Sequence, residues 1–249
     1  MDWLLYLLVV LVCFISGFIN TLAGSGSLLT LPLLIFMGLP VTVANGTNRI
    51  AILLQSIVGV RAFKQKKVFE WKDGLWLTIP ATIGALFGSI LAVELDEKLM
   101  NRIIGGLLVV MFFVILYKPE KWVSEQAGAV KAKPNFLRVV IFFAIGFYGG
   151  FIQAGVGFFL LAGLVLGAGY DLLKANAVKV LIVLVYTIVA LAVFIINKQV
   201  DYFLGIVLGV GSMFGAWLAT HVAVTRGIGF IRWFLLVTVL VVAIKMLFF

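Results

Sequence analysis

The stretch GFINTLAGSGSLLTLPLL, residues 17–34, places a Gly-Ser-Gly break inside an otherwise apolar run. A second stretch, GFIQAGVGFFLLAGLV (residues 150–165), repeats the pattern. Backbone that leaves the helix at membrane depth is tolerated only where protein or a water-filled cavity satisfies its N–H and C=O groups. We therefore expect the first elbow (residues 24–26) and the second elbow (residues 155–157) to face the interior and to mark a transport site near the midplane. Close helix packing through small residues is the alternative.

Composition places the chain in a membrane. It is 64% hydrophobic and only 12% charged, and its apolar runs match the ~20 residues that a helix needs to cross a bilayer core. The sequence predicts an all-α polytopic integral membrane protein, with the first run kept as a span and not removed as a signal peptide. The net charge of +9 is expected on cytoplasmic loops and not on a nucleic-acid-binding surface.

Apolar segments fall into two groups of five, joined by a polar stretch that contains four lysines and two prolines. The sequence thus predicts a first transmembrane repeat (1–117), a cytoplasmic linker (118–135) and a second transmembrane repeat (136–249). The predicted segments are 3–24, 25–40, 44–63, 74–93 and 99–117, followed by 139–157, 158–170, 174–196, 202–222 and 228–249.

The two groups align without a gap, in a single register that places Gly24 on Gly155 and Asn45 on Asn176. The connection near residues 61–72 carries five cations, whereas its counterpart in the second group carries only Lys198. This contrast favours inverted repeats, whose equivalent loops lie on opposite sides of the membrane. Inversion with five crossings per repeat requires the short segments 25–40 and 158–170 to cross. If both are re-entrant, there are eight crossings and a parallel repeat.

A candidate anion site comes from a second pair of aligned stretches, VANGTNRI (43–50) and KANAVKVL (174–181). Asn45 and Asn176 are good N-cap residues, and each following helix carries a cation in its first turns, Arg49 or Lys179. Free N–H groups, the positive end of the helix dipole and a cation together favour an anion. The alternative is that Arg49 and Lys179 extend along the protein to the membrane surface.

The full predicted site combines these residues with the elbows, whose amides and serines would coordinate substrate oxygens. Its members are Asn20, Gly24, Ser25, Gly26, Ser27, Asn45, Thr47, Asn48, Arg49, Gln153, Gly155, Gly157, Asn176 and Lys179. For Gln153, and for a further buried amide at Gln55, hydrogen bonding between helices is an equally good interpretation.

The residues that are missing also restrict the function. All ten carboxylates lie at or near segment ends, so no span carries the acidic group that a proton relay or cation site normally uses. The sequence has one histidine and one cysteine, and it shows no catalytic triad or metal-ligand spacing. We expect no enzymatic activity, no metal and no cofactor.

At these residues the chain resembles the sulfite exporter TauE/SafE family. The resemblance is carried by GFINTLAGSGSLLTLPLLIFMGLPVTVANGTNRIA and QSIVGVRAFKQKKV in the first half and by GFYGGFIQAGVGFFLLAGLVLGAGYDLLKANAVKVL in the second. It covers the chain except the 118–135 linker. Ser25 and Ser27 stand where family members usually have more glycines.

The resemblance implies a transporter that exports sulfite or short organosulfonates across the bacterial inner membrane, with a small sulfur anion and membrane lipid as partners. A homo-oligomer is compatible with it. A carrier or channel for another small anion, such as a carboxylate, is the alternative function, and a non-transporting membrane scaffold is a third.

Overall fold

The protein is all-α in the residues that the computed structural model describes, which are 3–68, 74–117 and 135–248. Nearly all of the predicted 118–135 linker lies outside them. In chain order the helices are α1 (Trp3–Ala23), α2 (Ser27–Phe36), α3 (Val41–Gln65), α4 (Leu75–Glu94), α5 (Glu97–Tyr117), α6 (Phe136–Phe151), α7 (Val156–Ala162), the π-helical turn η2 (Gly163–Gly167), α8 (Leu172–Ile196) and α9 (Tyr202–Phe248).

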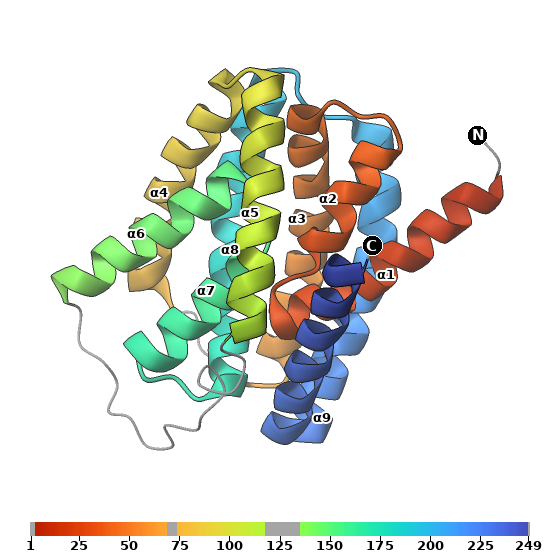
Figure 1. Cartoon of the computed structure of the whole chain (residues 1–249). Helices are drawn as coiled ribbons and strands as arrows, with labels where there is room; N and C mark the ends of the chain where they lie inside the picture. Colours follow the sequence, from red (N-terminus) through yellow and green to blue (C-terminus); the bar gives the residue numbers. More distant parts are fainter. Residues whose placement is uncertain (1–2, 69–73, 118–134, 249) are drawn as a thin grey trace.

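Helices α6 and α9 differ most from the predicted segments. The predicted segments 202–222 and 228–249 lie in one helical element, α9, in which the chain reverses its direction between the two segments (Figure 1). No proline interrupts the sequence between them, and its single glycine costs only about 1 kcal/mol in a helix. Segment 139–157 ends early, at Phe151, because Gln153 and Gly155 have φ angles of +71° and +73°, which an α-helix excludes.

Three helices in the described ranges are long and apolar enough to cross a membrane: Leu75–Glu94, Leu172–Ile196 and Tyr202–Thr225. Helix α3 has the same length as α8, 25 residues, but carries polar side chains along its middle. The apolar helices Ser27–Phe36 and Val156–Gly167 are much shorter than α3 and α8. At about 15 and 18 Å, neither spans a hydrocarbon core of about 30 Å by itself.

The backbone supports the predicted internal duplication. Helices α3 and α8 begin and end at aligned positions, in the same register that places Gly24 on Gly155. Positive φ angles recur in that register: +78° and +73° at Gly24 and Gly155, and +55° and +57° at Lys67 and Lys198. Because few non-glycine residues adopt this conformation, the lysine pair is an informative match.

Helices α3 and α8 lie side by side and run in opposite directions, as an inverted duplication requires. In Figure 1, α3 begins at the upper end of the molecule and α8 begins at the lower end. Arg49, early in α3, lies over the ring of Phe194, late in α8, whereas Gly59 of α3 faces Val180, early in α8.

The first helix of each half packs against the other half. Helix α1 packs against α9, and α6 packs against α4. Only glycine fits at these crossings, because a Cβ on Gly17 would lie 2.3 Å from the carbonyl oxygen of Ser212, and one on Gly146 would lie 2.0 Å from that of Ala81. Ala81 and Ser212 are aligned in the ungapped register, but Gly17 and Gly146 are aligned only after a shift of two positions. The ungapped alignment is therefore wrong for α1 and α6, and two extra residues precede the second elbow.

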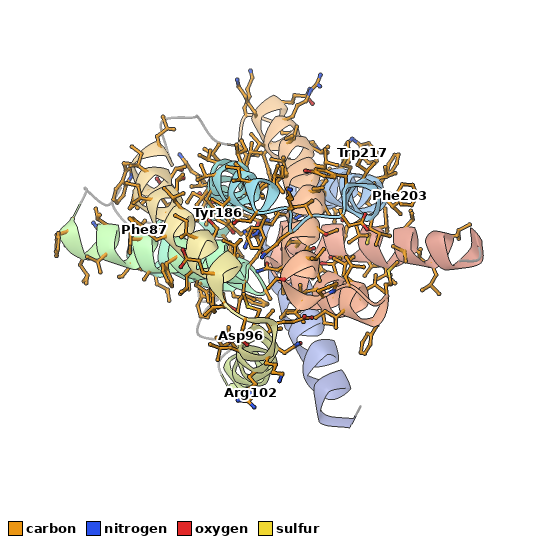
Figure 2. The ribbon with its side chains drawn as sticks, turned by 90° about the horizontal axis from the view of Figure 1, so that it is seen from above. Phe87, Asp96, Arg102, Tyr186, Phe203 and Trp217 are labelled. Carbon is orange, nitrogen blue, oxygen red and sulfur yellow. The ribbon has the colours of Figure 1, made fainter. Side chains whose placement is uncertain are left out.

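Apolar side chains cover the outside of the bundle. Figure 2 shows Phe87 of α4 and Phe203 and Trp217 of α9 on the outer side, and each is more than half exposed. Tyr186 of α8 lies in the interior and is fully buried. The exposed apolar surface fits a lipid environment, while the polar residues of α3 and α8 are turned inward.

Candidate functional site

The two elbows meet in the interior of the protein. A Cβ on Gly24 would lie 2.2 Å from the Cα of Gly157, and a Cβ on Gly157 would lie 2.2 Å from the Cα of Gly24. The backbone N–H of Gly157 donates to the carbonyl oxygen of Gly24 at 3.2 Å. In the first half, Ser16 Oγ fixes the elbow's last residue by donating to the carbonyl of Gly26 at 2.8 Å. Neither break is turned toward lipid, because residues 24–26 and 155–157 are all buried inside the protein.

Arg49 is fully buried and binds the end of α6. Its Nη1 donates to the carbonyl of Gly149 at 3.2 Å and to Oε1 of Gln153 at 2.9 Å, and its Nη2 donates to the carbonyl of Gly150. The guanidinium carbon lies 4.7 Å from the centre of the Phe194 ring. Carbonyls of a last helical turn lack intrahelical donors and carry the negative end of the dipole, so they stabilise this buried cation.

Lys179 binds the end of α1 in the same way. The side chain is 1% exposed, and its Nζ donates to the carbonyls of Asn20 at 3.2 Å and Thr21 at 2.9 Å. Asn20 and Thr21 correspond to Gly149 and Gly150 in the shifted register that relates α1 to α6. Each half thus supplies the cation that closes the broken helix of the other. Neither cation reaches the surface, so the alternative of surface-directed side chains is wrong.

The prediction that Asn45 and Asn176 cap helix starts is wrong. Helix α3 is preceded by Pro40, and α8 is capped by Asp171, whose side chain accepts from the backbone N–H of Lys174 at 2.9 Å. Both asparagines lie in the second helical turn, where the backbone N–H groups are already bonded within the helix. The two cations therefore meet helix C-termini, and the predicted pair of positive helix tips is absent from this site.

The two asparagines differ in their partners. Asn45 Nδ2 donates to the carbonyl of Phe151 at 2.7 Å, so that Asn45 and Arg49 together bind the last three carbonyls of α6. Asn176 is fully buried, and neither its oxygen nor its nitrogen has a partner among the described residues. Asn176 is therefore less completely hydrogen-bonded than its counterpart Asn45.

The other predicted polar residues are divided between separate places. Thr47 Oγ1 accepts from the backbone N–H of Asp201 at 2.9 Å, next to the start of α9. Asn48 Oδ1 accepts from Thr30 Oγ1 at 2.6 Å, and its Nδ2 is buried without a partner among the described residues. Ser25 Oγ is also buried without one, and Ser27 is buried at the start of α2.

A small cavity lies between the elbows and the middle of α3 and α8. It has a volume of ≈ 10 Å³, about the space for one water molecule. Six polar or charged residues and five valines or glycines line it: Asn20, Thr21, Gln55, Ser56, Gln153 and Lys179, with Gly24, Val156, Gly157, Val180 and Val183. Of the predicted site, the cavity brings together Asn20, Gly24, Gln153, Gly157 and Lys179, whereas Arg49 does not line it.

Ser56 and Phe194 were not predicted as site residues, and Gln55 was noted only as a buried amide. Ser56 follows Arg49 by seven residues, and Gln55 follows Asn48 by seven, so each pair shares a side of α3 two helical turns apart. The helical periodicity of polar side chains along α3 is the signal that could have placed them at the cavity. Within the described residues, no group of three or more His, Cys, Asp or Glu side chains could hold a metal ion.

The fold and the site define a polytopic membrane protein with a polar cavity between two broken helices, an arrangement typical of secondary transporters. The chain belongs to the sulfite exporter TauE/SafE family, whose model matches residues 9–246. The resemblance found in the sequence is thereby confirmed.

Similar proteins carry the name of probable membrane transporter. One from Sinorhizobium, named ORF9, is 27% identical and aligns over 94% of this chain and 89% of its own length. One from Haemophilus influenzae is 26% identical and aligns over 100% of this chain and 97% of its own length. YfcA of Escherichia coli is 26% identical and aligns over 95% of this chain and 87% of its own length. No solved structure matches the chain.

Proposed function

We propose that this protein exports small sulfur-containing anions, sulfite or short organosulfonates, across the bacterial cytoplasmic membrane through the cavity between its two halves. Membership of a transporter family supports the transport role, and the family description supports the sulfur anion. The observation that carries the proposal is the buried ammonium of Lys179 at a cavity with amide and hydroxyl groups and no carboxylate in its lining.

The chemistry of the lining suits an oxyanion. An ammonium group has three N–H donors, and Lys179 uses two of them on the carbonyls of Asn20 and Thr21. The third N–H, the hydroxyl of Ser56 and the side-chain amides of Gln55 and Gln153 supply donors for the oxygens of a sulfite or sulfonate group. Such charge-assisted hydrogen bonds are about twice as strong as neutral ones.

Binding requires the cavity to widen, because ≈ 10 Å³ accommodates no more than about one water molecule. The small size of the cavity supports a carrier that opens by moving the elbows apart, in preference to an open channel. An inside-negative potential favours outward movement of the anion by about 2.3 kcal/mol per charge per 100 mV. Export therefore needs no coupled proton in this scheme.

Efflux of labelled sulfite and methanesulfonate from proteoliposomes tests the proposal, with and without an imposed potential. We expect saturable efflux that accelerates when the anion leaves the negative side. Lys179→Gln should abolish it, whereas Lys98→Gln, at an exposed lysine of α5, should leave it unchanged. The proposal fails if Lys179→Gln transports normally, or if a carboxylate such as acetate moves while neither sulfur anion does.

A further inference from the structure

The lining of the cavity contains one charged group, the ammonium of Lys179. Its two observed acceptors, the carbonyls of Asn20 and Thr21, carry only the partial negative charge of a helix end. A bound anion with one negative charge would neutralise the ammonium. An anion with two negative charges would leave a net negative charge at this buried ammonium.

The charge of Arg49 lies outside the lining of the cavity. Both of its terminal nitrogens donate to the end of α6 or to Gln153, the ring of Phe194 lies beside the guanidinium, and the side chain does not line the cavity. The terminal N–H groups of Arg49 are thus bonded within the protein, and its charge lies outside the lining of the cavity.

Arg49 instead orients a neutral group of the site. Arginine only donates hydrogen bonds, so the Gln153 atom that lies 2.9 Å from Nη1 is the amide oxygen. The amide nitrogen of Gln153, a donor, is then the atom left for other partners, and Gln153 lines the cavity. Gln153 has a φ of +71°, a strained conformation for a residue with a side chain, which the surrounding contacts must hold in place. Gln153 follows the end of α6 in the stretch where the second half has two extra residues.

We infer that the cavity selects monoanionic over dianionic oxyanions, with Lys179 as the charge that the substrate meets and Arg49 as a positioning residue that acts through Gln153. This inference rests on the proposed function and adds the charge class of the substrate. Hydrogen sulfite and alkylsulfonates fit it, whereas sulfite in its doubly charged form and sulfate do not. The physical basis is the high cost of leaving a buried charge without a partner.

Methanesulfonate and sulfate form a matched pair for the test, because both are small and tetrahedral and they differ by one charge. Each is added as a competitor of labelled methanesulfonate efflux from proteoliposomes that contain the full chain. We expect sulfate to need a concentration at least roughly 100-fold higher for half-inhibition. Inhibition by sulfate within about threefold of methanesulfonate would overturn the inference and leave the proposed function standing. If no sulfur anion moves at all, the proposed function fails, and this inference fails with it.

Two variants test the assignment of the charges, and the wild-type comparison remains decisive if either fails to fold. Gln55→Lys adds a second cation to the cavity wall and should reduce the preference for methanesulfonate at least ~10-fold. Arg49→Gln should slow transport but keep the methanesulfonate-to-sulfate ratio within about threefold, since the substrate does not meet its charge. A ratio that changes more than ~10-fold in Arg49→Gln would show that the substrate meets the charge of Arg49, and would overturn its role as a positioning residue.

Discussion

Alanine at Gly24 would meet two obstacles, which Gly38 and Gly157 present one at a time. At Gly24 the backbone φ is +78°, and a Cβ would lie 2.2 Å from the Cα of Gly157. At Gly38 the φ is +93°, but no atom lies within 4 Å of the Cβ position. At Gly157 the φ is not in the positive range, but a Cβ would lie 2.2 Å from the Cα of Gly24.

The left-handed backbone costs an alanine about 1–2 kcal/mol, the expected loss for Gly38→Ala. Overpacking costs about 1–3 kcal/mol, and we expect Gly157→Ala at the upper end because the obstacle is backbone and not a flexible side chain. Gly24→Ala combines both, which gives roughly 2–5 kcal/mol. For a chain of this size each kcal/mol lowers the melting temperature by about 2–4 °C.

Thermal unfolding of the purified variants in detergent, followed by tryptophan fluorescence, measures the series. Gly105→Ala is the matched control, because no atom lies within 4 Å of its Cβ position and its φ is not positive. We expect melting temperatures to fall in the order Gly105→Ala, Gly38→Ala, Gly157→Ala, Gly24→Ala. If Gly157→Ala melts with the control, the elbows do not touch and the geometry of the central site is wrong.

Two further predictions use equivalent positions of the two halves. Asn45→Ala should destabilise the protein by about 1–3 kcal/mol, because it leaves a part-buried carbonyl of α6 unpaired. Asn176→Ala should cost less in the same melting assay, and equal losses would contradict the difference in their partners. Lys67→Cys and Lys198→Cys, each in a Cys13→Ala background, should react with an impermeant thiol reagent from opposite sides of the membrane. Labelling from one side would exclude the inverted repeat.

Sequence reasoning predicted the helical membrane class, most helix bounds and the positions of both breaks. These features depend on local signals, namely long apolar runs and glycines at matched positions. The continuous helical element α9 could not be predicted in this way. The polar residues and the glycine within 223–227 suggest a boundary, but none of these residues excludes a helix.

The predicted pair of positive helix tips failed for a different physical reason. Asn45 has the chemistry of an N-cap, but Pro40 and Asp171 lie upstream in the two halves and start the helices earlier. The actual partners of Arg49 and Lys179 are carbonyls in the opposite half of the chain. No local pattern indicates such pairs, because they arise from the way in which each half packs against the other.

The packing of α1 against α9 has a consequence for biosynthesis. Helix α1 leaves the ribosome long before α9, so the glycine surface around Gly17 has no partner until translation is almost finished. The first half also cannot close its own broken helix, since Lys179 belongs to the second. The break after α1 therefore stays incompletely bonded until Lys179 of α8 has been inserted, and the packing of α1 is completed only after α9 has been inserted.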